Sequence, residues 1–293
     1  MTSSVEQLCF TYEGHRRTAS IVVPHLVEKK CRPLPLLMVF HGMGATGAMA
    51  VADYGLHELA DRERVVVVAP DALPVWPDKK ISFRSNPRVW RTRPLDQGEP
   101  VDESEFALAL IDTVDLHVPT GIDRSRLYAC GFSNGGQVVW KLVVERADML
   151  SAAGIVCSTH SPLPLVPQPP TPIIWILGGC DPFCPTDGGV ITPPWGGEHT
   201  AVPVPVVRNT WLDAIGLPRE PMKTEFEGLC MREHYCDHDP FRRLLQITVT
   251  GMGHHWPGSP ARLPERVAGP ASDPFIGSNE IWQFCKQYCR TPG

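Results

Sequence analysis

Short apolar runs and longer amphipathic stretches alternate along most of the chain. The runs that predict strands cover residues 8–12, 17–23, 36–40, 65–69, 153–157, 173–177, 223–227 and 244–250, and one more leads into Gly131. Apolar positions at helical spacing predict helices over 48–62, 103–118, 137–146, 208–215 and 279–288. The run 65–69 is continuously apolar and mostly β-branched, which is typical of a parallel strand covered on both faces. The pattern therefore predicts an α/β fold with a mostly parallel, doubly wound sheet and helices on both faces.

The predicted elements form one continuous series, because no linker rich in Ser, Gly or charge divides the 293 residues. We therefore expect one domain over residues 1–293. Two stretches within it, 71–101 and 182–206, are rich in Pro and show no clear period. Long irregular stretches in a compact domain are commonly functional loops, so we expect both to wall the site.

The charge balance excludes some classes of partner. The chain has 27 basic and 32 acidic residues and a formal charge of −5. No run of Lys and Arg has the length of a patch for nucleic acid or lipid headgroups, so we expect no nucleic-acid partner. The apolar runs are strand-sized and far shorter than a membrane span, so we expect no membrane partner either.

The first residues, Met1 to Gln7, lack the basic start and apolar core of a secretory signal. As written, the sequence predicts a cytoplasmic protein, whereas a chain trimmed at its start would look the same and would fit secretion. The ten cysteines are a high number for either compartment. Local bridges are conceivable between Cys230 and Cys236 and between Cys285 and Cys289, but we expect mostly free thiols.

The segment from Gly131 to Gly135 reads Gly-Phe-Ser-Asn-Gly, between an apolar run and a predicted helix. This is the nucleophile-elbow pattern, in which a tight strand-to-helix turn lifts a serine hydroxyl clear of the sheet. A histidine can then reach the Oγ of Ser133, and backbone N–H groups can face the reacting carbonyl. Gly131 and Gly135 lack side chains, which allows the strand and the helix to approach closely.

A serine nucleophile needs a base and an acid to orient the base, and in this class of fold the acid precedes the histidine in sequence. Asp181 follows the predicted strand 173–177, at the edge where catalytic groups of an open α/β sheet gather. Asp187 is the competing acid, which we interpret as a turn former. His254 follows two glycines after the strand 244–250 and is the candidate base, with His255 as a partly exposed neighbour.

The segment His41-Gly-Met-Gly follows the strand 36–40, where the second donor of an oxyanion hole is expected. The predicted hole consists of the backbone N–H groups of Met43 and Asn134. His41 is interpreted as a residue that holds this loop. Such a site needs no metal and no organic cofactor.

Three tryptophans and one histidine are candidate substrate-binding residues: Trp90, Trp195, Trp256 and His255. Indole rings offer flat apolar surfaces for an aromatic acyl group or a polyester chain. Alternatively, the same rings are buried residues of the cavity wall.

Cys230, His234, Cys236 and His238 are soft ligands at close spacing, which raises a zinc hypothesis. The spacing differs from that of known zinc sites, and the stretch lies between two predicted strands. We therefore interpret it as a surface loop and expect no metal.

Several of these motifs together resemble the polyhydroxybutyrate depolymerase and feruloyl esterase family of α/β-hydrolases, the LpqC-like group. They are Gly-Phe-Ser-Asn-Gly-Gly, Asp-Pro-x-x-Pro-x-Asp-Gly-Gly with Cys184 inside it, Gly-His-His-Trp-Pro-Gly, Trp90-Arg91 with 101–106, and 280–284. The likeness extends from the opening strands to the last helix. It implies Ser133 as nucleophile, Asp181 as acid and His254 as base, and esters with a hydroxyacyl, acetyl or cinnamoyl part.

The sequence thus predicts a serine carboxylic ester hydrolase that acts through an acyl-enzyme on small-molecule or polymeric esters. The expected substrates are hydroxyalkanoate-type, acetyl or feruloyl and other aromatic esters, including polyester. A peptidase or an acyltransferase would use the same triad and differ only in leaving group or acceptor. A non-catalytic ligand-binding protein would keep the fold with a damaged triad, whereas here serine, acid, base and hole are all present.

Overall fold

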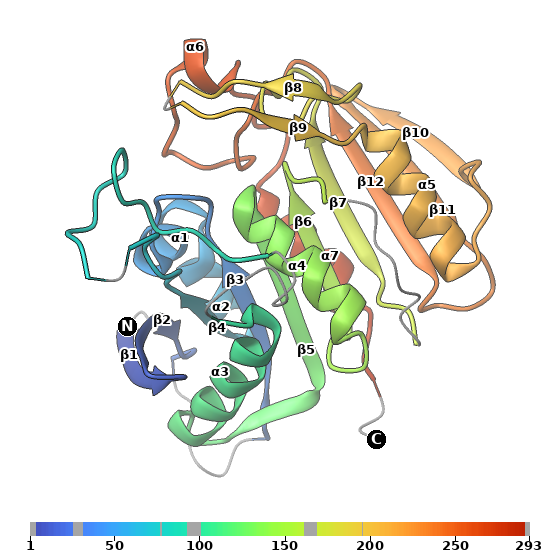
Figure 1. Ribbon diagram of the computed structural model, residues 1–293. Helices are drawn as coiled ribbons and strands as arrows, with labels where there is room; N and C mark the ends of the chain where they lie inside the picture. The colour runs from blue at the N-terminus through green and yellow to red at the C-terminus, as the bar shows by residue number, and fades with distance from the viewer. Residues whose placement is uncertain are drawn as a thin grey trace.

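The computed structural model describes residues 4–25, 32–76, 78–92, 101–160, 169–194 and 196–290. Ten strands of these residues pair in one sheet, in the order β1-β2-β4-β3-β5-β6-β7-β12-β11-β10 (Figure 1). The strands are β1 (Val5–Tyr12), β2 (His15–Val22), β3 (Leu34–Phe40), β4 (Val66–Pro70), β5 (Ile122–Phe132), β6 (Ala152–Val156), β7 (Ile173–Gly178), β10 (Lys223–Glu227), β11 (Cys230–Cys236) and β12 (Arg243–Val249). Strands β3 to β7 and β12 are parallel, and two antiparallel strands extend the sheet on each side.

Helices cover both faces of this sheet. On one face lie α3 (Glu103–His117), α4 (Asn134–Glu145) and α5 (Val204–Ile215), and on the other lie α1 (Gly47–Asp53), α2 (Leu56–Glu63) and α7 (Gly277–Cys285). Each face has its own apolar core, since alternate residues of a strand point to opposite sides. Burial on both sides explains why the central strands are almost wholly apolar. The predicted α/β class, with a mostly parallel and doubly wound sheet, is confirmed.

Two predicted elements differ from the structure. The helix predicted over 48–62 is divided into α1 and α2, because Gly55 adopts a left-handed conformation with φ of 67°. The stretch 230–236, interpreted from the sequence as a surface loop, is strand β11, so that interpretation was wrong. It pairs with β12 on one side and with the exposed strand β10 on the other. Its charged residues are partly buried and paired, Arg232 with Glu280 and Glu233 with Gln246, so the strand lacks an apolar pattern.

The described parts of the two long irregular stretches carry little regular structure. Within 182–206, β8 (Gly189–Ile191) and β9 (His199–Ala201) form a small two-stranded sheet, seen at the top of Figure 1 with α6 (Glu265–Ala268). Within 71–101, Pro74 pairs with Arg88 and Ser82 with Asn86, so the described part of this stretch folds back on itself. Described residues of both stretches lie near the carboxyl ends of the central strands.

The nine cysteines that the structure describes are all free. Cys230 and Cys236 stand six residues apart on the extended strand β11, which separates them by about 20 Å and excludes a local bridge. In the part of the chain that is described, no helix has the length and apolar character needed to cross a membrane.

The register of the sheet aligns the carboxyl ends of five neighbouring strands. Phe40 of β3 lies beside Gly131 of β5, and Phe132 of β5 beside Val156 of β6. Val156 in turn lies beside Ile176 of β7, whose Gly178 pairs with Val249 of β12. The residues that follow these strands are therefore brought to one edge of the sheet, although more than two hundred positions separate the first from the last in sequence.

Candidate active site

Ser133 stands at the turn between β5 and α4, in a strained backbone conformation with φ of 54° and ψ of −121°. Non-glycine residues seldom adopt positive φ, and such strain persists only where the surroundings enforce it. Here the N–H of Ser133 donates to the carbonyl oxygen of Val156 at 3.0 Å, which ties the turn to the neighbouring strand β6. The elbow geometry that the sequence indicates is present, and the serine lines a cavity at this edge.

The glycines around Ser133 have no room for a side chain. A Cβ on Gly131 would lie 2.2 Å from the carbonyl oxygen of Gly135, and one on Gly135 would lie 2.1 Å from that of Phe40. A Cβ on Gly136 would meet the side chain of Ser158 at 2.5 Å. The close approach of strand and helix predicted from Gly131 and Gly135 is confirmed.

Asp181 and His254 are in direct contact although 73 positions separate them: Oδ2 of Asp181 lies 2.8 Å from Nδ1 of His254. The second oxygen, Oδ1, accepts the backbone N–H groups of Phe183 at 2.8 Å and Cys184 at 2.9 Å. Burial raises the pKa of the Asp181 carboxyl, but His254 and these two N–H groups lower it by more, so the net pKa lies below its usual value. Asp181 is therefore a carboxylate, and it accepts a hydrogen bond from the N–H at Nδ1 of His254.

The imidazole of His254 is fixed by its loop and by two rings. The ring centroid of Phe132 lies 4.8 Å from it, and that of Phe183 lies 5.1 Å from it at nearly a right angle. The loop is tied down because the N–H of Gly253 donates to the carbonyl of Pro270 at 2.7 Å. Phe132 directly precedes Ser133, and both Ser133 and His254 line the same cavity.

The loop after β3 lies against the elbow. A Cβ on Gly42 would come within 3.6 Å of the Cβ of Ser133, which shows how closely this backbone passes the serine. Met43 follows directly and lines the cavity. Asn134 is the first residue of α4, so its N–H has no acceptor within the helix. Two backbone segments with N–H groups thus flank Ser133.

His41 holds this loop in place. Its side chain is fully buried, Nδ1 donates to the carbonyl of Gly42 at 2.7 Å, and Nε2 accepts the N–H of Ala72 at 3.1 Å. Burial lowers the pKa of His41 to about 4, so the ring is neutral at pH 7. The structure therefore gives His41 a positioning role, as the sequence interpretation held.

The cavity has a volume of about 860 Å³ and is walled mainly by apolar side chains. Both predicted loops contribute to its wall: Phe83 and Val89 from the first, and Phe183, Cys184 and residues 196–202 from the second. Met49, Phe83 and Leu263 are each more than 40 % exposed and form an apolar rim at its mouth. A cavity of this size accommodates a substrate considerably larger than an acetyl group.

Three of the four candidate substrate-binding residues, Trp90, Trp256 and His255, do not line the cavity. Trp90 and Trp256 are 1 % and 3 % exposed, so the alternative interpretation as wall residues describes them. Trp90 donates through Nε1 to the carbonyl of His41 at 2.9 Å, and Trp256 stacks on Tyr54 with 4.1 Å between ring centroids. The expectation of a partly exposed His255 is wrong, because its side chain is buried and Nε2 bonds to the carbonyl of Gly269 at 2.9 Å. Trp195 lies outside the described residues.

Asn134 carries a further role that its backbone position did not indicate. Its side chain accepts the N–H of Trp90 at 2.7 Å and donates to the carbonyl of the same residue at 3.1 Å. The elbow is thereby joined to the loop 71–101.

Asp187, the competing acid, is exposed in a turn after Pro185 and does not line the cavity.

The zinc hypothesis for residues 230–238 gains no support from the geometry. Cys230 is buried, whereas Cys236 lies at the far end of β11 with its sulfur 3.6 Å from that of Met222. Among the described residues, the group of His, Cys, Asp and Glu side chains whose donor atoms lie close together is instead Cys157, Asp181 and His254. Nothing in the local sequence around Cys157 marks this buried thiol as a neighbour of Asp181.

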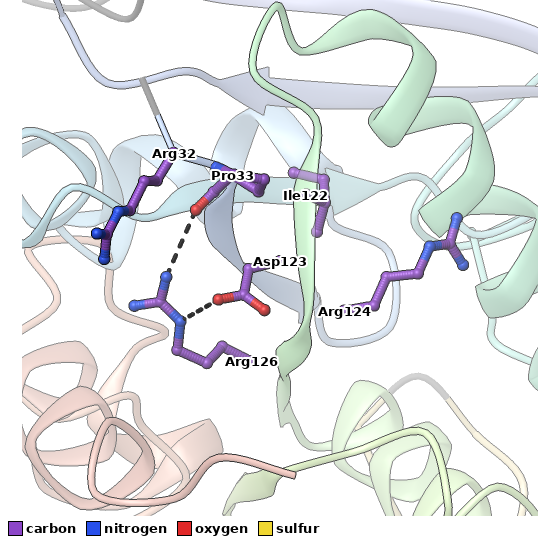
Figure 2. Close-up of a pocket in the computed structure, with 6 residues that line it drawn as sticks. All are labelled: Arg32, Pro33, Ile122, Asp123, Arg124 and Arg126. Atoms are coloured by element: carbon purple, nitrogen blue, oxygen red, sulfur yellow. Dashed lines mark hydrogen bonds and ion pairs between the residues drawn. The ribbon is translucent and has the colours of Figure 1, made fainter. Parts of the chain in front are cut away.

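A second cavity, of about 620 Å³, lies at the opposite, amino end of β5 (Figure 2). Three arginines line it: Arg32, Arg124 and Arg126. In Figure 2 the guanidinium of Arg126 points toward Asp123, with Nε 2.6 Å from Oδ2, and toward the carbonyl of Pro33. Arg124 pairs with Asp112 at 2.6 Å and with Asp115 at 3.2 Å. This cavity presents paired surface charges and no nucleophile.

Comparison with known proteins places the chain among esterases. The model of the phospholipase/carboxylesterase family matches residues 23–194, more than half of the chain. The chain is 27 % identical over 271 residues to the "Putative esterase NocK" of Nocardia uniformis subsp. tsuyamanensis, a match that covers 87 % of this chain and 74 % of that protein.

Solved structures with the same fold are also esterases or related hydrolases. The acetyl xylan esterase from Aspergillus awamori aligns with a TM-score of 0.63 at 14 % identity, over 95 % of this chain and 98 % of that one. The S-formylglutathione hydrolase from Agrobacterium tumefaciens aligns with a TM-score of 0.57 at 13 % identity, over 98 % of this chain and 100 % of that one. At such identities the likeness shows the α/β-hydrolase fold.

Proposed function

Because the chain belongs to the phospholipase/carboxylesterase family and is a serine carboxylic ester hydrolase, we propose that Ser133, Asp181 and His254 are its catalytic triad. We propose further that the N–H groups of Met43 and Asn134 form its oxyanion hole. The observation that carries the proposal is the buried contact of Asp181 with His254, at 2.8 Å, beside the cavity that Ser133 lines. Ion pairs that only decorate a surface are exposed, whereas both side chains of this pair are buried at the wall of a cavity.

The reaction follows from these positions. Nε2 of His254 takes the proton of the Ser133 hydroxyl while Oγ attacks the ester carbonyl, and the tetrahedral oxyanion accepts hydrogen bonds from the two backbone N–H groups. The imidazolium then gives its proton to the departing alcohol, and an acyl-enzyme remains. Water repeats the sequence and releases the carboxylic acid. Asp181 stabilises the imidazolium and holds the ring in the tautomer that leaves Nε2 unprotonated in the resting state.

The cavity supports a bulky ester rather than a minimal acetyl ester. Its volume of about 860 Å³ and its mainly apolar wall suit a hydroxyalkanoate-type or a feruloyl and other aromatic acyl group. The exposed side chains of Met49, Phe83 and Leu263 at the mouth would lie along the continuation of such a substrate, as in a polyester chain. These are the substrate classes that the resemblance to the depolymerase and feruloyl esterase family also implies.

The decisive experiment compares the wild type with Ser133→Ala on p-nitrophenyl acetate and p-nitrophenyl butyrate. We expect kcat/KM to fall by roughly 10⁴-fold or more, because the acyl-enzyme requires the hydroxyl. Circular dichroism and thermal unfolding of both proteins serve as the control for folding. Equal rates in the two folded proteins would remove Ser133 from the mechanism.

The substrate proposal needs a separate measurement. A panel of methyl ferulate, hydroxybutyrate oligomers, acetylated sugar and an aromatic polyester is compared by kcat/KM on the wild type. We expect the aromatic or hydroxyalkanoate esters to exceed the acetylated sugar, since their apolar parts fill the cavity. A clear preference for the acetylated sugar would contradict this part of the proposal and leave the triad intact.

A further inference from the structure

Cys157 occupies a central position that the ester hydrolysis itself does not use. It is the first residue after β6, and β6 lies in the sheet between β5, which leads to Ser133, and β7, which leads to Asp181. It is 1 % exposed and lines the cavity. The backbone at Cys157 has φ of 47°, so a non-glycine residue is held here in a conformation that L-residues seldom adopt.

The thiol lies beneath the loop that carries His254. Its Sγ is 3.5 Å from the carbonyl oxygen of His255 and 3.8 Å from that of Gly253, the two neighbours of His254 in sequence. One donor atom each of Cys157, Asp181 and His254 lies within 4.8 Å of the others. All three side chains are buried, so water competes little for these atoms.

Thiolate, imidazole and carboxylate are the three donors that zinc uses in proteins, at about 2.3, 2.0 and 2.1 Å. Donors of a tetrahedral ion at such lengths lie about 3.3 to 3.6 Å apart. Each of the three separations would have to change by no more than about 1.5 Å to reach that spacing. A fourth ligand, water, can enter from the cavity, because Cys157 and His254 both line it.

We propose that Cys157, Asp181 and His254 form an inhibitory site for a thiophilic divalent cation such as Zn²⁺ or Cd²⁺. The proposal rests on the proposed function, because the cation inhibits by coordinating two members of the proposed triad, Asp181 and His254. On binding, the thiol of Cys157 loses its proton to solvent and its sulfur coordinates the ion. The carboxylate of Asp181 exchanges its hydrogen bond to Nδ1 for a bond to the ion.

Either ring nitrogen of His254 leads to inhibition. If Nδ1 coordinates, the single proton of the neutral ring must move to Nε2, the atom that has to be unprotonated to accept the proton of Ser133. If Nε2 coordinates, its lone pair is no longer available. The ion therefore removes the base without touching Ser133. Alkaline-earth cations such as Mg²⁺, which prefer oxygen ligands, would leave activity unchanged.

The test measures the Zn²⁺ concentration that halves p-nitrophenyl butyrate hydrolysis in the wild type, Cys157→Ser and Cys180→Ser. The hydrolysis rate of each protein is expressed relative to the rate of the same protein in EDTA. We expect reversible inhibition of the wild type, and at least about a tenfold higher half-inhibitory concentration for Cys157→Ser, since a serine hydroxyl is a poor ligand for zinc. Cys180→Ser removes the exposed thiol next to Asp181 and should remain as sensitive as the wild type. Equal sensitivity of Cys157→Ser and the wild type would overturn the proposal.

A binding measurement separates failure of the metal site from failure of the proposed function. Ser133→Ala protein is titrated with Cd²⁺, and the ultraviolet absorbance of the cadmium–thiolate bond is recorded with and without the added change Cys157→Ser. We expect the protein with Cys157→Ser to bind one equivalent of Cd²⁺ fewer through a thiolate, whether or not the enzyme hydrolyses esters. Identical titrations would exclude the site even if Zn²⁺ inhibits. If Cys157→Ser fails to fold, Cys157→Ala is used in both experiments.

Discussion

The two cavities lie at the two ends of β5, and the charged side chains at these ends find their partners in different ways. At the amino end, Arg126 pairs with Asp123, three residues away, and their side chains are 39 % and 27 % exposed. At the carboxyl end, His254 pairs with Asp181 across 73 positions, and their side chains are 7 % and 0 % exposed. The cavity volumes, about 620 and 860 Å³, are similar.

Volume therefore does not identify the functional end. The difference lies in the cost of each arrangement: an exposed local pair needs no tertiary support, whereas a buried pair is stable only with further hydrogen bonds. Asp181 receives such support from the N–H groups of Phe183 and Cys184. Strained backbone adds to the contrast, since Ser133 and Cys157 at the carboxyl end both have positive φ.

The largest effect should come from removing the charge of the aspartate at each end. Asp181→Asn should lower kcat/KM on p-nitrophenyl butyrate by roughly 10³- to 10⁴-fold, because the amide favours the wrong tautomer of His254. Asp123→Asn should leave the rate within about twofold, since a surface pair contributes little. Comparable losses in both variants would erase the distinction between the two ends.

A steric test compares two glycines near the opposite ends of the strand. In Gly131→Ala the new Cβ would lie 2.2 Å from a backbone carbonyl oxygen, so we expect a loss of about 3 kcal/mol or more in the free energy of unfolding. In Gly121→Ala the nearest atom is a side-chain oxygen of Asp115 at 3.0 Å, and φ of 69° should cost about 1 to 2 kcal/mol. Urea unfolding of the two variants measures the difference. Equal midpoints would mean that the elbow tolerates a Cβ.

The buried His41 should make stability depend on pH. Its pKa is about 4 in the folded protein against 6.5 for the free side chain, so the unfolded chain binds more protons between these values. The free energy of unfolding should therefore fall as the pH drops from 6.5 towards 4, by about 2 kcal/mol between pH 7 and pH 5 from this group. The lowered pKa of Asp181 acts in a more acidic window, below the ordinary pKa of aspartate.

His41→Gln isolates that contribution, because the amide oxygen can still accept the N–H of Ala72 and does not titrate. We expect the variant to lose less stability than the wild type between pH 7 and pH 5, as measured by urea unfolding at each pH. Parallel losses in the two proteins would show that His41 is not the group responsible.

The smallest effect is expected for Arg126→Ala at the amino end. Its ion pair with Asp123 is partly exposed and screened by solvent, so stability should change by less than about 1 kcal/mol. Ester hydrolysis should be unchanged, because no residue of this cavity lines the other. A marked loss of activity would indicate that the two ends of β5 communicate.

Much of the fold and site was predictable from local patterns. The buried run before Pro70 and the run into Gly131 indicate parallel strands, since both faces of such a strand must be apolar. The elbow around Ser133 was predictable because its requirement is local: small residues must flank a tight turn. Strand β11 was missed, since its charged residues are partly buried through pairs with residues of other elements, such as Arg232 with Glu280, and such long-range pairs leave no apolar signal in the sequence.

By itself, the sequence determined the α/β class, the elbow and the order of candidate acid and base, because each depends on residues close together in the chain. Only the tertiary structure decided that Asp181 meets His254, that Trp90, Trp256 and His255 are buried behind the cavity, and that Cys157 lies beside the acid. The physical reason is that burial and contact depend on the register of five neighbouring strands. Their carboxyl ends bring together side chains that no local pattern connects.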